Sequence, residues 1–181
     1  NAEKLAAAFL KMGLVKGDRV ATILPTSIQF VMADYAISRA GLVHIPSSSL
    51  EPLETLRHKF KEGTPKALVC LAQHGEMAKG LMVKSSVKHL ILTKIDDYAT
   101  DVAELKGYEI VSDVPGAIWL TDLLKKESGD GLPPQACDVE REVETLLFTG
   151  GTTGVPKGCM LTHRNIYANT IQNFYAVGPS A

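Results

Sequence analysis

The chain alternates between short apolar runs and longer segments in which apolar residues recur at helical spacing. The apolar runs occupy residues 20–24, 43–45, 67–71 and 88–93, and their starts are 23, 24 and 21 residues apart. That distance leaves room for one crossover helix between parallel strands. Because the runs are almost continuously apolar, we expect strands that are covered on both faces. The pattern predicts an α/β fold with a largely parallel sheet flanked by helices.

The segments between these runs have the apolar periodicity of helices that pack on a sheet. Thr26 or Ser27 is suited to cap the second helix, and Pro52 to open the third. We interpret the apolar stripes as core faces. The three stripes consist of Leu5, Ala8, Phe9 and Met12; of Ile28, Val31, Met32 and Tyr35; and of Leu53, Leu56 and Phe60.

The regular alternation ends near residue 94. Residues 94–142 are rich in Asp, Gly and Pro, and we expect an irregular excursion and linker with one short helix around residues 119–126. The final segment begins as a strand, continues as a Gly/Thr-rich loop and ends as a helix capped by Thr162. The predicted division places βα repeats in residues 1–93, and the strand, loop and following helix in residues 143–181.

The overall charge narrows the class of partner. The 181 residues include 19 Lys and Arg against 20 Asp and Glu, for a formal net charge of −1. This balance argues against nucleic acid or an acidic membrane surface as a partner held by bulk charge. With 45% hydrophobic and 22% charged residues, the composition is that of a globular protein rather than a disordered one.

The cysteines and the apolar runs bear on the cellular compartment of the protein. Cys70, Cys137 and Cys159 are far apart and form no C-x-x-C pair, so we expect neither a disulfide scaffold nor a zinc site. No apolar run approaches the length of a membrane span, and no signal peptide is visible. The chain begins with Asn1 and is already helical in pattern there, so we interpret its start as a cut. We expect a cytoplasmic protein, with peripheral contact to a membrane as the open alternative.

The loop at residues 149–158 has the composition of a phosphate-binding loop. Its four glycines lack a Cβ, so backbone N–H groups can turn toward an anion and be approached closely. Three threonine hydroxyls and Lys157 add hydrogen-bond donors and one positive charge, and a strand at residues 143–148 leads directly into the loop. The loop is not a Walker A loop, because Pro156 precedes Lys157 and Gly158 follows it.

This loop, together with the run Met-Leu-Thr-His-Arg-Asn at residues 160–165, resembles the phosphate-loop signature of the adenylate-forming enzymes. That superfamily contains acyl- and aryl-CoA synthetases, peptide-synthetase adenylation domains and luciferase-like enzymes. The resemblance covers most of the chain, is weakest over residues 94–142, and implies part of the large N-terminal domain of the acyl-CoA synthetase fold. Upstream stretches match the family in the same order: Gly17-Asp18-Arg19-Val20-Ala21, Leu24-Pro25, Ala40-Gly41 and Ile45-Pro46.

The resemblance implies a two-step reaction. A carboxylate attacks the α-phosphorus of ATP to give an acyl-adenylate and pyrophosphate, and the thiol of coenzyme A then displaces AMP. Magnesium would bridge phosphate oxygens, but no residue of this chain is assigned as its ligand. The residues that would bind the β- and γ-phosphates of ATP are Thr149, Gly150, Gly151, Thr152, Thr153, Gly154, Lys157 and Gly158.

The resemblance also implies that much of the enzyme lies outside this chain. We expect the adenine and ribose contacts, the hinge and the C-terminal domain with its catalytic lysine to follow residue 181. No catalytic residue is therefore assigned within the fragment, which we expect to be inactive alone.

Gly150 narrows the substrate class, because many members of the superfamily carry Ser at that position. A Gly within Phe-Thr-Gly-Gly-Thr-Thr-Gly is similar to fatty-acyl-CoA synthetases, so we expect a fatty acid as the carboxylate. Three alternatives stay open: an aryl-CoA synthetase, an amino-acid adenylating member, and a non-catalytic nucleotide- or phosphate-binding module. The sequence does not predict an oligomeric state.

Other chemically active side chains have structural interpretations. His44 lies in an apolar strand, where a hydrogen-bonded core histidine is more common than a ligand. His163 lies at a predicted helix start and is expected to be structural. Cys159 is close to the loop but has no identifiable base, so we interpret it as a small buried residue. The Asp-rich stretch that begins at Asp96 lacks the spacing of a calcium loop and is expected to be solvated.

Overall fold

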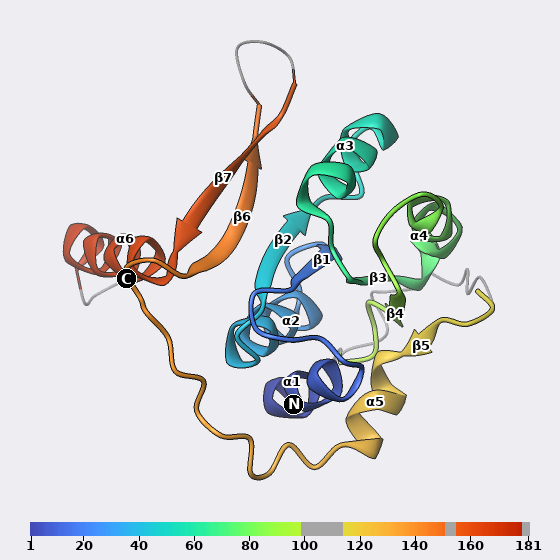
Figure 1. Ribbon diagram of the computed structural model, residues 1–181, viewed down its shortest axis with the longest axis horizontal. Coiled ribbons are helices and arrows are strands. Elements are labelled where there is room, and N and C mark those ends of the chain that lie inside the picture. Colours follow the sequence, from blue (N-terminus) through green and yellow to red (C-terminus); the bar gives the residue numbers. More distant parts are fainter. Residues whose placement is uncertain (99–113, 151–154, 179–181) are drawn as a thin grey trace.

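The computed structural model describes residues 1–98, 114–150 and 155–178, which form a sheet with helices on both faces (Figure 1). The strands are β1 (Arg19–Ile23), β2 (Val43–Ser47), β3 (Ala67–Leu71), β4 (His89–Thr93), β5 (Ile118–Trp119), β6 (Val143–Thr149) and β7 (Lys157–Thr162). The helices are α1 (Ala2–Lys11), α2 (Ile28–Arg39), α3 (Leu53–Gly63), α4 (Gly75–Met82), α5 (Leu120–Lys126) and α6 (His163–Val177), with a 3-10 turn at Ala72–His74.

The strands lie in the order β5-β4-β3-β1-β2-β6-β7. Neighbouring strands from β5 to β6 are parallel, and only the β6–β7 pair at the edge is antiparallel. The prediction of a largely parallel α/β sheet is therefore confirmed. The predicted short helix is present as α5, whereas the sequence pattern did not predict the two-residue strand β5 beside β4.

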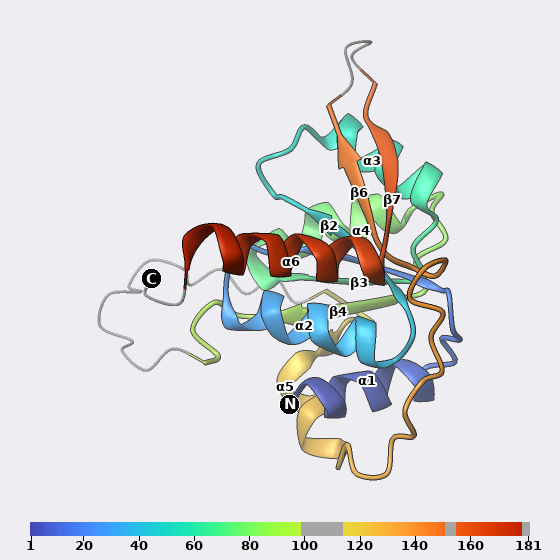
Figure 2. The same cartoon turned by 90° about the vertical axis from the view of Figure 1, so that its left-hand side faces the viewer.

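Both faces of the strands β1 to β4 are buried, as the continuous apolar runs predicted. In β3, the side chains of Ala67, Val69 and Leu71 pack with α1, α2 and α5. The alternate side chains, Leu68 and Cys70, pack with α3 and α4. Figure 2 shows these two helix layers on opposite sides of the strands. A sheet covered in this way leaves only the ends of its strands open to ligands.

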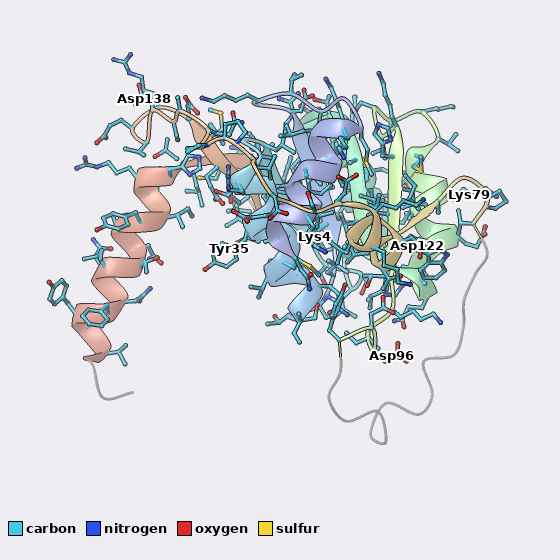
Figure 3. The ribbon with its side chains drawn as sticks, turned by 90° about the horizontal axis from the view of Figure 1, so that it is seen from below. Lys4, Tyr35, Lys79, Asp96, Asp122 and Asp138 are labelled. Carbon is cyan, nitrogen blue, oxygen red and sulfur yellow. The ribbon has the colours of Figure 1, made fainter. Side chains whose placement is uncertain are left out.

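The predicted core face of α2 is wrong in part. Of that stripe only Met32 is buried, whereas the side chains of Ile28 and Tyr35 are 58% and 66% exposed, and the labelled Tyr35 points away from the body of the molecule in Figure 3. The alanines let α1 pack closely, and the amide of Gln29 tolerates burial because it donates to the Lys94 carbonyl at 2.7 Å. The residues that α2 buries are Gln29, Met32, Ala33, Ala36 and Ile37.

Helix α6 has the predicted cap but no buried face. Thr162 accepts the N–H of Asn165, and the Asn165 side chain accepts the N–H of Thr162 in return. The helix stands away from the sheet in Figure 3, and Tyr167 and Phe174 are 68% and 56% exposed. Within the described part of the chain, no helix is both long enough and apolar enough to cross a bilayer.

An ion pair joins the starts of β1 and β3. The carboxylate of Asp18 accepts from the Lys66 ammonium at 2.8 Å and from the Val15 N–H at 2.9 Å. Burial alone would raise the pKa of Asp18. The bonds from Lys66 and Val15 and the charges of Lys66 and Arg19 outweigh that effect and hold the pKa below its ordinary value of 3.8.

We expect Asp18→Asn to lower the free energy of unfolding at neutral pH by about 1 kcal/mol, because it removes a charged acceptor from two donors. The folded-state pKa of Asp18 lies below its unfolded value. Its contribution is therefore complete above pH 3.8 and is lost as the pH falls below that value through the folded-state pKa. In urea titrations, the difference between the wild type and the variant should shrink only below that pH.

Asp122→Asn is the matched control. Its carboxylate is 53% exposed and lies 3.8 Å from Lys125, so its removal should change stability little at any pH. An Asp18 variant whose deficit is the same at neutral and strongly acidic pH would contradict the assigned role.

Candidate functional site

The candidate site is built on the β6–β7 hairpin, which extends beside α3 in Figure 1. Thr149 is the last residue of β6 and Lys157 the first of β7, and the two are paired across the strands. Because β6 runs parallel to β2, Thr149 lies at the edge where the carboxyl ends of the parallel strands meet. This is the position that the sequence predicted for the loop.

Half of the predicted phosphate-binding residues are described by the structure. Thr149, Gly150, Lys157 and Gly158 lie on the two stems of the hairpin. Directly opposed residues in an antiparallel pair project to the same face, so Thr149 and Lys157 share one face of the hairpin. The other four predicted residues lie outside the described part of the chain: Gly151, Thr152, Thr153 and Gly154.

Lys157 is the fixed positive charge of this face. Its side chain is exposed, and no hydrogen bond or ion pair joins its ammonium to any residue of the described ranges. An ammonium that has no carboxylate partner among the described residues is available to an external anion. With the Thr149 hydroxyl on the same face, the hairpin stems present a donor and a cation to the same region of solvent.

The two described glycines of the loop have different surroundings. A Cβ on Gly150 would meet no atom of the described residues within 4 Å, so nothing in that part of the chain blocks a ligand from its backbone. A Cβ on Gly158 would lie 3.0 Å from Leu146 Cδ1 and 3.4 Å from Phe148 Cζ. Neither glycine has a positive φ. Gly158 is therefore explained by close packing against β6, and Gly150 by exposure of the backbone.

The opposite face of the hairpin packs on α3 through Phe148. The ring of Phe148 meets the ring of His58 edge-on, with 6.3 Å between centroids, and the ammonium of Lys59 lies 5.7 Å from its centroid. His58 also reaches the loop itself, because its Nε2 is 2.9 Å from the carbonyl oxygen of Pro156. The hairpin thus has one face that is anchored and one that is free.

Lys59 is a buried cation that the sequence analysis did not single out. Its side chain is 6% exposed, and its ammonium pairs with Glu51 at 2.6 Å. The second oxygen of Glu51 accepts the Ser48 N–H at 2.7 Å. Its spacing could have identified it as a buried residue, since Lys59 lies between Leu56 and Phe60 on the apolar stripe of α3. A charge at such a position needs a partner when it is buried.

Of the predictions for other reactive side chains, the one for His44 is confirmed and the one for Cys159 is wrong. His44 is a core histidine as predicted: it is 1% exposed, its Nδ1 lies 2.7 Å from Asp34 and its Nε2 2.8 Å from Thr22. The prediction that Cys159 is buried is wrong, because it lies exposed on the edge strand β7. Cys70 is buried instead, which raises its pKa to about 12 and makes it a poor nucleophile.

Two concave surfaces of the described residues lie away from Thr149 and Lys157. One hollow of about 840 Å³ lies between α6 and residues 139–140, and another of about 330 Å³ lies at the amino ends of β1, β2 and β6. Within the described ranges, no three His, Cys, Asp or Glu side chains come together as a metal site would require. The described site is thus a charged hairpin rather than an enclosed pocket.

Comparison with known proteins agrees with the motif. The sequence profile of the family described as AMP-binding enzyme matches residues 1–179. A long-chain-fatty-acid–CoA ligase of Salmonella typhimurium is 33% identical over 187 residues, which cover 96% of this chain and 33% of the ligase. The chain therefore spans about one third of the length of this curated relative. The resemblance drawn from the loop and the upstream stretches is confirmed.

Solved structures support the same conclusion about the fold. A long-chain-fatty-acid-CoA ligase from Archaeoglobus fulgidus has a TM-score of 0.78 at 29% identity, over 99% of this chain and 32% of its own. The ATP-bound MatB from Rhodopseudomonas palustris has a TM-score of 0.74 at 24% identity, over 96% of this chain and 30% of its own. At that lower identity the likeness shows the fold alone.

The surroundings of Gly158 and Gly150 predict that a valine at these two positions has different effects on stability. Gly158→Val should lower the free energy of unfolding by about 1–3 kcal/mol, because its Cβ already crowds Leu146 and Phe148. Gly150→Val should change it by less than about 0.5 kcal/mol, because that position is open. Chemical denaturation measures both; equal losses would contradict the packing described for Gly158.

Proposed function

The chain belongs to the family of AMP-binding enzymes, and from that premise we propose that its Gly/Thr-rich loop holds the β- and γ-phosphates of ATP. The observation that carries the proposal is the placement of Lys157. It is an exposed cation paired across the hairpin with Thr149, at the carboxyl edge of a parallel sheet. Fixed donors at this place suit a leaving pyrophosphate, whose negative charge grows in the transition state.

We assign the phosphate contacts to the whole predicted set. Thr149 and Lys157 supply a hydroxyl and a positive charge, and Gly150 leaves its backbone open to close approach. Gly158 lets the second stem pack closely against Phe148, which helps to position the neighbouring residue Lys157. Hydroxyl and backbone donors complete the set at Gly151, Thr152, Thr153 and Gly154.

The reaction that we propose for the whole protein is the activation of a carboxylic acid as an acyl-adenylate and its transfer to coenzyme A. The 33% identity to a long-chain-fatty-acid–CoA ligase supports a fatty acid as the substrate, as does Gly150 in the loop. Magnesium bound to ATP would neutralise phosphate charge in this reaction. The described residues offer hydrogen-bond donors for phosphate, and no three His, Cys, Asp or Glu side chains come together among them, so we assign no residue as a magnesium ligand.

The role of this chain within the enzyme is phosphate binding. It corresponds to about one third of the length of the Salmonella ligase. We propose that residues 1–93, 94–142 and 143–181 are successive parts of one N-terminal domain. The catalytic lysine and the adenine, ribose and coenzyme A contacts would belong to the other two thirds. The balanced charge and the unpaired cysteines support a cytoplasmic enzyme.

The proposal predicts carboxylate-dependent ATP–pyrophosphate exchange by the full-length protein, fastest with fatty acids. Lys157→Ala should reduce the exchange by about 10- to 100-fold, because a fixed charge at the departing phosphates is lost. Isothermal titration with pyrophosphate should show a parallel loss of affinity.

Lys79→Ala is the matched control, since Lys79 lies on α4, which is separated from the hairpin by α3 in Figure 1. It should leave both the exchange rate and pyrophosphate binding unchanged. Exchange with aromatic or amino acids alone would assign a different substrate class. Pyrophosphate binding without exchange for any acid would indicate a non-catalytic binding module.

A further inference from the structure

Among the described residues, a side-chain hydrogen bond from His58 ties the phosphate loop to α3. Nε2 of His58 lies 2.9 Å from the carbonyl oxygen of Pro156. A carbonyl oxygen only accepts hydrogen bonds, so Nε2 of His58 carries the hydrogen and donates it. Pro156 immediately precedes Lys157, so the bond holds the backbone at the base of the lysine.

The hydrogen bond from His58 holds Pro156 at a position where strand pairing does not. Pro156 has no N–H and cannot donate to the facing strand, which weakens the ladder where the second stem begins. The paired residues start one position later, at Lys157 opposite Thr149. The carbonyl of Pro156 and its bond to His58 therefore fix the stem at the point where strand pairing ends.

The same helix also holds the first stem. Phe148 immediately precedes Thr149, and its ring meets His58 edge-on while Lys59 lies 5.7 Å from its centroid. Helix α3 thus contacts each stem at the residue before the one that faces the phosphates. A shift of α3 would move both stems together.

Helix α3 is itself rigidly placed. Lys59 is buried and pairs with Glu51 at 2.6 Å, which links the helix to the segment after β2. At the last residue of the helix, a Cβ on Gly63 would lie 2.6 Å from Ile45 Cδ1, so the helix backbone packs against that side chain of β2. These contacts make α3 a fixed support for the hairpin.

We propose that His58 is a positioning residue that sets the place of Lys157 through the carbonyl of Pro156. The proposal rests on the function proposed above for the loop. Lysine has a long flexible stem, so the reach of its ammonium depends on where its backbone is held. Loss of the tie lets the stem move away, which weakens the binding of ATP phosphates and leaves the carboxylate site unaffected.

Two amide variants of the full-length protein test the hydrogen bond separately from the bulk of the side chain. The amide nitrogen of Gln reaches the position of His Nε2, whereas that of Asn reaches only the position of Nδ1. In ATP–pyrophosphate exchange, His58→Asn and His58→Ala should raise the KM for ATP by about five- to tenfold, the loss expected for one hydrogen bond. His58→Gln should stay within about twofold of the wild type, and the KM for the carboxylate should not change in any of them. His89→Ala, at the start of β4, is the control histidine.

Lys157→Ala separates this proposal from the proposed function. Because His58 acts through Lys157, His58→Ala combined with Lys157→Ala should be no worse than Lys157→Ala alone, within about twofold. If Lys157→Ala itself has no effect, the phosphate-binding function is wrong. If Lys157→Ala is impaired but the Asn and Gln variants of His58 have equal KM values for ATP, the positioning role alone is overturned. Should His58→Ala not fold, the comparison of Asn with Gln decides.

Discussion

The burial of the central parallel strands between two helix layers is the constraint on which the other features depend. Each strand from β1 to β6 lies beside a parallel neighbour, and alternate side chains of the central strands enter opposite cores. Burial of this kind removes apolar surface from water on both faces and leaves the strand ends as the exposed polar edge. It is the reason that β6 delivers its loop to the carboxyl edge, and the reason that α3 has a fixed position from which to hold that loop.

One face of the hairpin packs on α3, and the other carries the side chains proposed to bind phosphate. Phe148 is half-buried against His58 and Lys59 of α3, and Gly158 lies beside it on the same face, whereas Thr149 and Lys157 project from the other face and are exposed. The period of two along a strand makes this division automatic, because neighbouring residues point in opposite directions. The hairpin thereby presents the Thr149 hydroxyl and the Lys157 ammonium on one face without burying them.

Two apolar faces of the chain remain uncovered. Ile28 and Tyr35 on α2, and Tyr167 and Phe174 on α6, expose large side chains that a stable globular surface usually covers. Helix α6 buries none of its residues, although its cap is complete. Local signals are therefore sufficient to specify that helix and its boundaries, whereas its packing depends on partners that the described residues do not supply.

Local chemistry determined much of this protein from the sequence alone. The strand and helix order, the cap at Thr162 and the position of the loop after β6 follow from period, capping and turn residues. Only the tertiary structure decided which face α2 buries and what supports the loop. The pattern marked Ile28 and Tyr35 on α2 as core, but the alanines beside α1 and the satisfied Gln29 are buried instead. The sequence likewise identified Lys157, whereas the role of His58 arises from a contact with Pro156 that is 98 residues away along the chain, and that of Lys59 from a contact with Phe148. Periodicity and capping act within a few residues, whereas packing partners that are distant along the chain meet only in the folded sheet.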